Sequence, residues 1–201
     1  MITLGILISG SGSNLQAIID AIAAGELDAR IAIVISNKQE AFGLERAQKA
    51  GIDARFVDPK SFASMHEYNE ELCALLQTAD VDYVVMAGYM RLLGTEVLDA
   101  FPQRVLNLHP ALLPSFPGAH GIADALEYGV KVTGVTVHFA DEVFDRGAIL
   151  AQEAVAVRED DTEDSLAERI HEVEHRMYPK ALQLLAEKKA HISGRKVRIG
   201  Q

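Results

Sequence analysis

Residues 2–24, ITLGILISGSGSNLQAIIDAIAA, decide the fold of this chain. Ile2 to Ser9 form a nearly continuous apolar run, which is typical of a central parallel strand that is covered on both faces. A glycine-rich turn follows, and Leu15 to Ala24 have the pattern of a helix, with Ser13 or Asn14 as its N-cap. A strand, a turn and a helix in this order form the repeating unit of a parallel α/β sheet.

The same alternation of strands and helices continues to the end of the chain. We expect strands at 29–36, 54–57, 83–86, 105–109, 132–139 and 149–157, and helices at 42–50, 64–79, 95–100 and 122–128. A long helix should open at residues 160–162, kink at Pro179 and end near residue 189, and a hairpin should follow at 191–199. This order predicts a doubly wound, mostly parallel sheet with helices on both faces and an antiparallel C-terminal part, which is a Rossmann-like α/β fold. The sequence contains no internal repeat, low-complexity tract or linker, so we expect residues 1–201 to form a single domain.

Composition limits the partners of the chain. It has 201 residues, of which 49% are hydrophobic, and its formal charge of −10 argues against a nucleic-acid partner, which requires a basic surface. No apolar run approaches the roughly 20 residues that span a bilayer, and the first strand follows Met1 with no basic leader, so we expect no membrane partner and no signal peptide. The single cysteine, Cys73, excludes an internal disulfide and suits a reducing cytoplasm. Without a cysteine cluster we expect no metal site.

Gly10-Ser11-Gly12-Ser13-Asn14 lies between the first predicted strand and the first predicted helix. Free N–H groups and the positive end of a helix dipole at such a position favour an anion. The turn lacks the Lys of a nucleotide P-loop, and Leu15 occupies the place of the third glycine in the dinucleotide fingerprint. Two interpretations stay open: a tight turn alone, or a cradle for a phosphate that belongs to neither ATP nor NAD.

Residues 105–118, VLNLHPALLPSFPG, place polar groups at the end of a predicted strand. Asn107 and His109 share one face because strand side chains alternate, and Pro110 ends the strand. Ligands of open α/β sheets bind at the carboxyl ends of the strands, where an amide N–H and an imidazolium N–H could stabilise a developing oxyanion. The alternative is a buried Asn and His that satisfy nearby backbone groups.

Two charged residues in predicted loops are candidates for the same site. Asp145 lies in the acidic loop 140–147, one strand beyond the polar face of Thr136 and His138. A carboxylate beside a His can orient and charge the imidazole, although a lone loop Asp is commonly solvated or caps a turn. Arg91 follows the fourth predicted strand, where it is either solvated or holds an acidic ligand.

Several motifs, taken in order, carry a resemblance to a known family: ISGSGSNLQAI, SNK with AFGLERA, AGYMRLL, NLHPALLPSFPG, GVTVHFADEVFDRGAIL and HEVEHRMYPKAL. Over nearly its whole length the chain resembles the phosphoribosylglycinamide formyltransferases, the folate-dependent enzymes of purine synthesis. The resemblance implies a formyltransferase domain over residues 1–201 that transfers a formyl group from 10-formyltetrahydrofolate to the amine of 5'-phosphoribosylglycinamide. It also implies a metal-free reaction between small molecules, catalysed by a cytoplasmic monomer or homodimer.

The resemblance assigns roles to particular residues. It implies that the catalytic residues are Asn107, His109 and Asp145. It implies that the amine substrate contacts Gly12, Ser13, Asn14, Gly88 and Glu174, the first three through its phosphate. It implies a folate pocket formed by Met90, Arg91, Leu92, Leu93, Asn107, Ala140, Asp141, Glu142, Val143 and Phe144. Supporting polar positions are matched by His120, Thr136 and His138.

Two departures and three alternatives accompany the resemblance. Met65 stands where family members often carry an arginine near the folate tail or the substrate rim, and Phe144 replaces a more usual aliphatic residue. A formyltetrahydrofolate deformylase, in which water replaces the amine, is the alternative reaction on this scaffold, but such enzymes carry an added N-terminal domain. Methionyl-tRNA formyltransferases carry an added C-terminal nucleic-acid-binding domain. A catalytically inert phosphate sensor would need the glycine-rich turn but not Asn107, His109 and Asp145 together.

Overall fold

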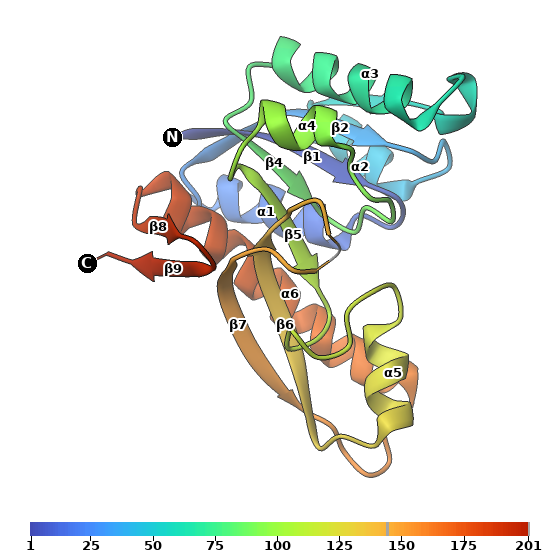
Figure 1. Ribbon diagram of the computed structural model, residues 1–201, viewed down its shortest axis with the longest axis vertical. Helices are drawn as coiled ribbons and strands as arrows, with labels where there is room; N and C mark the ends of the chain where they lie inside the picture. The colour runs from blue at the N-terminus through green and yellow to red at the C-terminus, as the bar shows by residue number, and fades with distance from the viewer. Residues whose placement is uncertain (144, 201) are drawn as a thin grey trace.

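The computed structural model describes residues 1–143 and 145–200. Phe144, which the resemblance places in the folate pocket, therefore lies outside the described residues. The strands are β1 (Ile2–Ile8), β2 (Ala29–Ser36), β3 (Asp53–Phe56), β4 (Tyr83–Met86), β5 (Val105–His109), β6 (Val132–Phe139), β7 (Ile149–Ala156), β8 (Ala190–Ser193) and β9 (Lys196–Ile199). Within the described residues they form one nine-stranded sheet in the order β3-β2-β1-β4-β5-β6-β7-β9-β8 (Figure 1).

The pairing of neighbouring strands changes from parallel to antiparallel between β5 and β6. The neighbours from β3 across to β5 all pair in parallel, in the manner of a doubly wound α/β sheet. β6 then runs antiparallel to β5, and β7 runs antiparallel to β6. The hairpin of β8 and β9 extends the sheet beyond β7. The predicted fold class, including its antiparallel C-terminal part, is confirmed.

Helices cover both faces of the sheet. They are α1 (Ser13–Ala23), α2 (Phe42–Lys49), α3 (Met65–Thr78), α4 (Thr95–Ala100), α5 (Gly121–Tyr128) and α6 (Glu163–Ala186), with a short 3-10 helix, η1 (Pro59–Ser61). α1 and α6 pack over one apolar core and α3 and α4 over another, on opposite faces of the sheet (Figure 1). In the part of the chain that the structure describes, no helix combines the length and the apolar character that crossing a membrane requires.

The N-caps of α1 and α6 differ. α1 follows Gly12, whose left-handed backbone (φ 70°) makes this glycine the N-cap in place of the predicted Ser13 or Asn14. α6 follows Thr162, which forms a capping box with Ser165: each side chain accepts a hydrogen bond from the other residue's backbone N–H. The predicted opening of the long helix is therefore confirmed, whereas the predicted cap of the first helix is wrong.

α6 continues through Pro179 to Ala186 without a break at the predicted kink. Pro179 lies on the buried face of this helix, where packing against the sheet opposes a break. The neighbouring Tyr178 is fully buried, and its hydroxyl contacts the carbonyl oxygens of Met86 (3.1 Å) and Leu106 (3.2 Å). α6 is thereby joined to the two strands whose carboxyl ends border the site.

Candidate functional site

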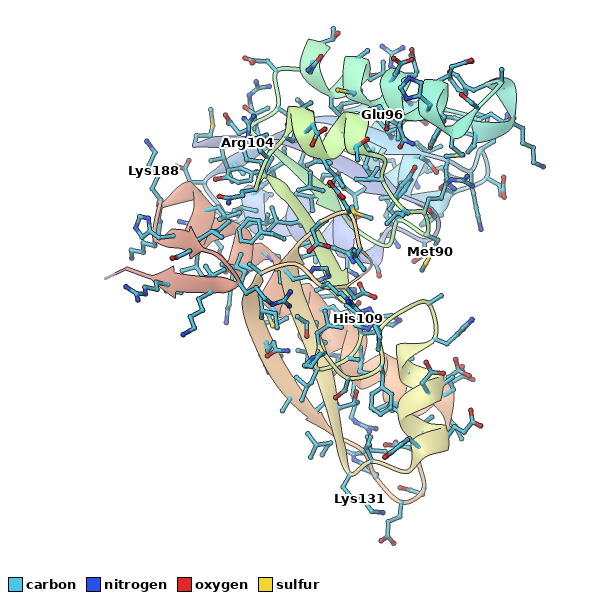
Figure 2. All side chains as sticks on the ribbon, in the orientation of Figure 1. Met90, Glu96, Arg104, His109, Lys131 and Lys188 are labelled. Carbon is cyan, nitrogen blue, oxygen red and sulfur yellow. The ribbon has the colours of Figure 1, made fainter. Side chains whose placement is uncertain are left out.

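The pairing of β5 with β6 brings four polar side chains to one face of the sheet. Asn107 lies opposite His138 and His109 lies opposite Thr136 in this antiparallel ladder. Residues directly opposite each other in such a ladder point to the same face. His109, Thr136 and His138 are almost completely buried, and Figure 2 shows His109 near the middle of the molecule. The alternation that predicted a shared face for Asn107 and His109 is confirmed.

Asp145 reaches this face from the loop between β6 and β7. Its carboxylate lies 3.5 Å from His109 Nδ1, 3.5 Å from His138 Nε2 and 3.5 Å from Asn107 Nδ2. Its side chain is only 3% exposed, and the Gly118 N–H donates a hydrogen bond to Oδ2 (2.8 Å). The structure therefore brings together the three residues predicted to be catalytic, and Asp145 is not a solvated loop residue.

The loop that carries Asp145 is closed at its base. The Phe139 N–H donates to the Ala148 carbonyl (2.9 Å), so the two ends of residues 140–147 lie side by side. A Cβ on Gly147 would overlap the Phe139 carbonyl oxygen, which explains the glycine at this position. The base of the loop is thus part of the sheet, while Asp145 extends over its polar face.

The surroundings of Asp145 keep its carboxylate ionised. Burial alone would raise the pKa of Asp145, because a charged group loses hydration there. A hydrogen bond from His138, the Gly118 N–H and the nearby imidazoles of His109 and His138 outweigh this effect, and the pKa of Asp145 falls below its ordinary value. At neutral pH the site therefore contains a buried negative charge that faces two imidazoles.

The hydrogen bonds of His109 determine which of its nitrogens carries a proton. Nε2 lies 2.7 Å from the Phe116 carbonyl oxygen, which can only accept, so Nε2 carries a hydrogen. Nδ1 faces Asp145, and a donation from this nitrogen requires a ring that is protonated on both sides. His109 can therefore act as a donor at Nδ1 only as an imidazolium.

A buried hydrogen-bond network supports the loop that follows His109. The Thr136 hydroxyl donates to the Ala111 carbonyl (2.6 Å) and accepts from the Leu113 N–H (3.1 Å). Gln152 Nε2 donates to the Leu113 carbonyl (2.9 Å) and to Thr136 Oγ1 (3.0 Å). Sequence reasoning missed Gln152, although its position opposite Thr136 follows once β6 and β7 are paired in register.

A cavity of about 470 Å³ lies beside the residues predicted to be catalytic, at the carboxyl ends of β1 and β4. It is lined by the whole glycine-rich turn, residues 10–14, and by Gly88 and Glu174, which are the residues predicted to contact the amine substrate. Leu108 and Pro110, which flank His109, also line it. The cavity therefore extends from the glycine-rich turn to the end of the strand that carries the two predicted donors.

Glu174 organises one wall of this cavity. It is only 4% exposed, and its Oε2 accepts hydrogen bonds from Asn14 Nδ2 (2.9 Å) and from His171 Nδ1 (2.9 Å). Asn14 Oδ1 is buried and has no hydrogen-bond partner within the described residues. Sequence reasoning missed His171, although it lies one helical turn before Glu174.

His171 also forms a His-x-x-x-His pair with His175, so the expectation of no metal site was wrong to take such pairs as absent. The two rings are stacked, with centroids 6.3 Å apart. Across residues 1–143 and 145–200, no group of three or more His, Cys, Asp or Glu side chains is arranged to hold a metal ion. The absence of a metal from the reaction stays a prediction.

Packing against α2 requires a glycine at position 12, whether or not a ligand binds the turn. Its φ is +70°, and a Cβ at this position would lie 2.6 Å from the Gly43 Cα on α2. The Gly43 N–H also donates to the Gly10 carbonyl (3.1 Å), which fixes the turn on this helix. A side chain at position 12 would therefore disturb the turn whether or not a phosphate is bound.

Among the described residues, those predicted to bind folate line several different hollows. Met90, which is 72% exposed, lines the cavity described above, whereas Arg91 lines a separate hollow of about 410 Å³. Residues 140–142 line another hollow of about 300 Å³, beside the C-terminal hairpin. Leu93 is 4% exposed and packs in the core under α3 and α4. The folate pocket therefore stays a prediction, with the Leu93 side chain unavailable to a ligand.

Arg91 is held beside Met65, one of the two departures from the family pattern. Arg91 Nη2 lies 3.0 Å from Met65 Sδ, and its guanidinium carbon lies 5.8 Å from the centroid of the Tyr68 ring. Its Nε is buried and has no hydrogen-bond partner among the described residues. Arg91 is therefore not fully solvated, and its role toward an acidic ligand stays a prediction.

Comparisons with known proteins agree with this geometry. The sequence profile described as formyl transferase matches residues 3–182. Phosphoribosylglycinamide formyltransferase of Bacillus subtilis strain 168 is 38% identical over 177 residues, which cover 88% of this chain and 91% of that protein. The trifunctional purine biosynthetic protein adenosine-3 of Drosophila melanogaster is 47% identical over 190 residues, which cover 94% of this chain but only 14% of that protein. The crystal structure of glycinamide ribonucleotide transformylase 1 from Symbiobacterium toebii superimposes with a TM-score of 0.99 at 50% identity, over 100% of this chain and 95% of that one.

Proposed function

This chain belongs to the phosphoribosylglycinamide formyltransferase family, and we propose that its site transfers a formyl group from 10-formyltetrahydrofolate to the amine of 5'-phosphoribosylglycinamide. The observation that carries the proposal is the convergence of two donors, the half-buried Asn107 and the buried His109, with the buried, ionised carboxylate of Asp145, beside a cavity that begins at a glycine-rich turn. Formyl transfer requires these parts: donors for an oxyanion, an acceptor for a proton and a place for a phosphorylated amine.

The donors act when the amine attacks the formyl carbon. The formyl oxygen then gains negative charge, and Asn107 Nδ2 and His109 Nδ1 donate to it as the tetrahedral intermediate forms. A donor of this kind contributes roughly 3–4 kcal/mol to transition-state stabilisation in acyl transfer. The Phe116 carbonyl holds the hydrogen on Nε2, so the donation from Nδ1 uses the imidazolium form of His109.

Asp145 has two roles in this reaction. Its carboxylate lies 3.5 Å from His109 Nδ1 in a buried site and orients the imidazole ring. Its carboxylate also accepts the proton that the attacking nitrogen must lose and passes it, through water, to the folate nitrogen that leaves. No covalent intermediate on the protein is needed.

The glycine-rich turn and Glu174 hold the amine substrate. The turn presents backbone N–H groups at the start of α1, where the helix dipole favours the phosphate monoester. Oε2 of Glu174 accepts from Asn14 and His171. Its other oxygen accepts no hydrogen bond from the described residues and can accept one from a hydroxyl or amine of the substrate. With both reactants held, the encounter becomes effectively unimolecular.

One assay separates this function from its alternative. The purified chain is incubated with 10-formyltetrahydrofolate, with and without 5'-phosphoribosylglycinamide, and formylated product and free formate are measured. We expect product only when the amine substrate is present and little formate in its absence. Rapid formate release without the amine would instead indicate the deformylase, an alternative that the relatives named above do not favour.

A further inference from the structure

The loop between β4 and α4, residues 87–94, is attached to other elements at both of its ends. Residues 90–93 of this loop are among those that the resemblance assigns to the folate pocket. At the start of the loop, the Ser9 N–H donates to the Gly88 carbonyl (3.1 Å), and the Ser9 hydroxyl accepts from the Met90 N–H (2.9 Å). The residue that follows β1 therefore holds the first half of the loop.

The buried side of α3 holds the second half. Asn69 is only 4% exposed; its Oδ1 accepts from the Gly94 N–H (3.1 Å), and its Nδ2 donates to the Met65 carbonyl (2.7 Å). The hydroxyls of the buried Tyr68 and Tyr89 lie 2.7 Å apart. Gly94 is the N-cap of α4, so these contacts fix the point at which the loop becomes a helix.

An ion pair on the outer side of α3 closes the same junction. His66 on α3 contacts Glu96 on α4 through Nδ1, and its Nε2 lies 3.4 Å from Glu70 Oε1 (Figure 2). Because an ionised carboxylate only accepts hydrogen bonds, both ring nitrogens carry a hydrogen when both contacts are made. A neutral imidazole would turn a lone pair toward one of the two carboxylates. The arrangement therefore favours the imidazolium of His66.

The charged groups that act on His66 are Glu67 and Glu70 on α3 and Glu96 on α4. The hydrogen bond to Glu96 and the charges of these carboxylates raise the pKa of His66 above its ordinary value. The ion pair is complete while His66 is charged and is lost as the pH rises through this raised pKa. Because the His66 side chain is 64% exposed, water screens the pair and keeps its contribution small.

The position of Glu96 is coupled to the end of the loop. A Cβ on Gly94 would overlap Glu96 Oε2, so the carboxylate rests against the backbone of the N-cap. A displacement of Glu96 would therefore reach Gly94, whose N–H is held by Asn69 on α3. The ion pair and the buried hydrogen bond act on the same two elements, α3 and α4.

We propose that His66 is a positioning residue: as an imidazolium between Glu70 and Glu96 it ties α4 to α3 and holds residues 87–94 in the conformation that binds the folate. This inference rests on the proposed function for the identity of the ligand. His66 acts through Glu96 and the loop, so it should affect folate binding and leave the chemical step unchanged. An exposed ion pair of this kind corresponds to at most about a fivefold change in affinity.

The first test measures the dissociation constant of 10-formyltetrahydrofolate between about pH 7 and about pH 9, a range that spans the loss of charge from an imidazolium with a raised pKa. At the lower pH, His66→Gln should bind about three- to fivefold more weakly than wild type, because glutamine carries no charge. This difference should disappear at the higher pH. His66→Lys should match wild type at the lower pH and bind about three- to fivefold more tightly than His66→Gln at the higher pH, because lysine stays protonated.

The second test measures the loop without any ligand. Amide hydrogen exchange of residues 87–100 at the lower pH should be faster in His66→Gln than in wild type, and His66→Lys should restore the wild-type rate. In all variants, binding of 5'-phosphoribosylglycinamide and kcat should be unchanged. The matched control is His191→Gln, the same substitution on the exposed C-terminal hairpin, which should retain wild-type folate binding and exchange.

The outcomes separate the inference from the proposed function. If His66→Gln followed wild type in folate affinity at every pH, or left the exchange of residues 87–100 unchanged, the role of His66 would be overturned while formyl transfer continued. If the exchange responded to the charge at position 66 as expected but the chain transferred no formyl group, the proposed function would be wrong and the tie between α3 and α4 would stand.

Discussion

Asp145→Asn removes one buried charge and leaves the shape of the side chain nearly unchanged. The carboxylate lies 3.5 Å from the nearest nitrogen of His109 and 3.5 Å from that of His138. At an effective dielectric constant of about 20, a unit charge pair at this separation is worth about 4–5 kcal/mol. The asparagine oxygen can still accept from the Gly118 N–H, so we expect a loss of about 4 kcal/mol of transition-state stabilisation, which is about a 10³-fold fall in kcat.

The assay for Asp145→Asn measures kcat for formyl transfer and the dissociation constant of each substrate. Binding should change by no more than about threefold, because the carboxylate acts mainly on the transition state. Asp99→Asn, on the exposed surface of α4, is the matched control and should retain full activity. A variant with kcat within about threefold of wild type, or with raised Michaelis constants and an unchanged kcat, would refute the assigned role.

The pH profile gives the same prediction an independent check. The pKa of Asp145 is held below its ordinary value, so the carboxylate is ionised at neutral pH. The acidic loss of activity therefore occurs when the pH falls through that lowered pKa. The part of the stability that the ionised group contributes is lost over the same acidic range. Asp145→Asn should lack this acidic limb of the kcat profile. An unchanged acidic limb would assign it to another group.

Three further predictions concern the donors, the folate side and the glycine-rich turn. His109→Ala and Asn107→Ala should each lower kcat by about 10²–10³-fold with little change in substrate affinity, as steady-state kinetics would show; a rise in the Michaelis constant alone would make them binding residues. Met65→Arg should change the dissociation constant of 10-formyltetrahydrofolate or of the amine substrate, but not the rate of the chemical step, because Met65 Sδ lies 3.0 Å from Arg91 Nη2. Equal binding of both substrates before and after the substitution would show that position 65 does not touch either of them. Gly12→Val should weaken binding of 5'-phosphoribosylglycinamide more than binding of folate. It should also lower the free energy of unfolding by more than about 2 kcal/mol, because the valine Cβ would lie 2.6 Å from the backbone of α2. A melting temperature equal to that of wild type would contradict the packing argument. The riboside that lacks the phosphate should be a poor substrate for the unmodified chain.

Local patterns in the sequence predicted the elements and one half of the site. Alternation along residues 105–109 placed Asn107 and His109 on the same face, because the period of a strand is a property of the backbone alone. The glycine-rich turn was recognised from its position between an apolar strand and a helix. These predictions depend on neighbours in the sequence, and the structure confirms the placement of these residues.

The remainder of the site depends on contacts between distant elements. Gln152 and His171 acquire their roles from Thr136 and Glu174, and no local pattern indicates which partner a side chain will meet. The N-cap of α1 was missed because the backbone of Gly12 is left-handed and lies so close to α2 that a Cβ would not fit there. Tertiary packing, which local propensity does not contain, decided each of these features.

Because the loop between β6 and β7 is closed at its base, two separate segments supply the donors and the acid of the site. The sheet supplies Asn107 and His109, while a separate segment, joined to the sheet by the bond from the Phe139 N–H to the Ala148 carbonyl, supplies the acid. Changes that keep Gly147 and this closing bond can reposition Asp145 while both strands keep their pairing. Laboratory evolution that varies residues 140–146 would therefore alter the position of the acid while the two donors stay fixed.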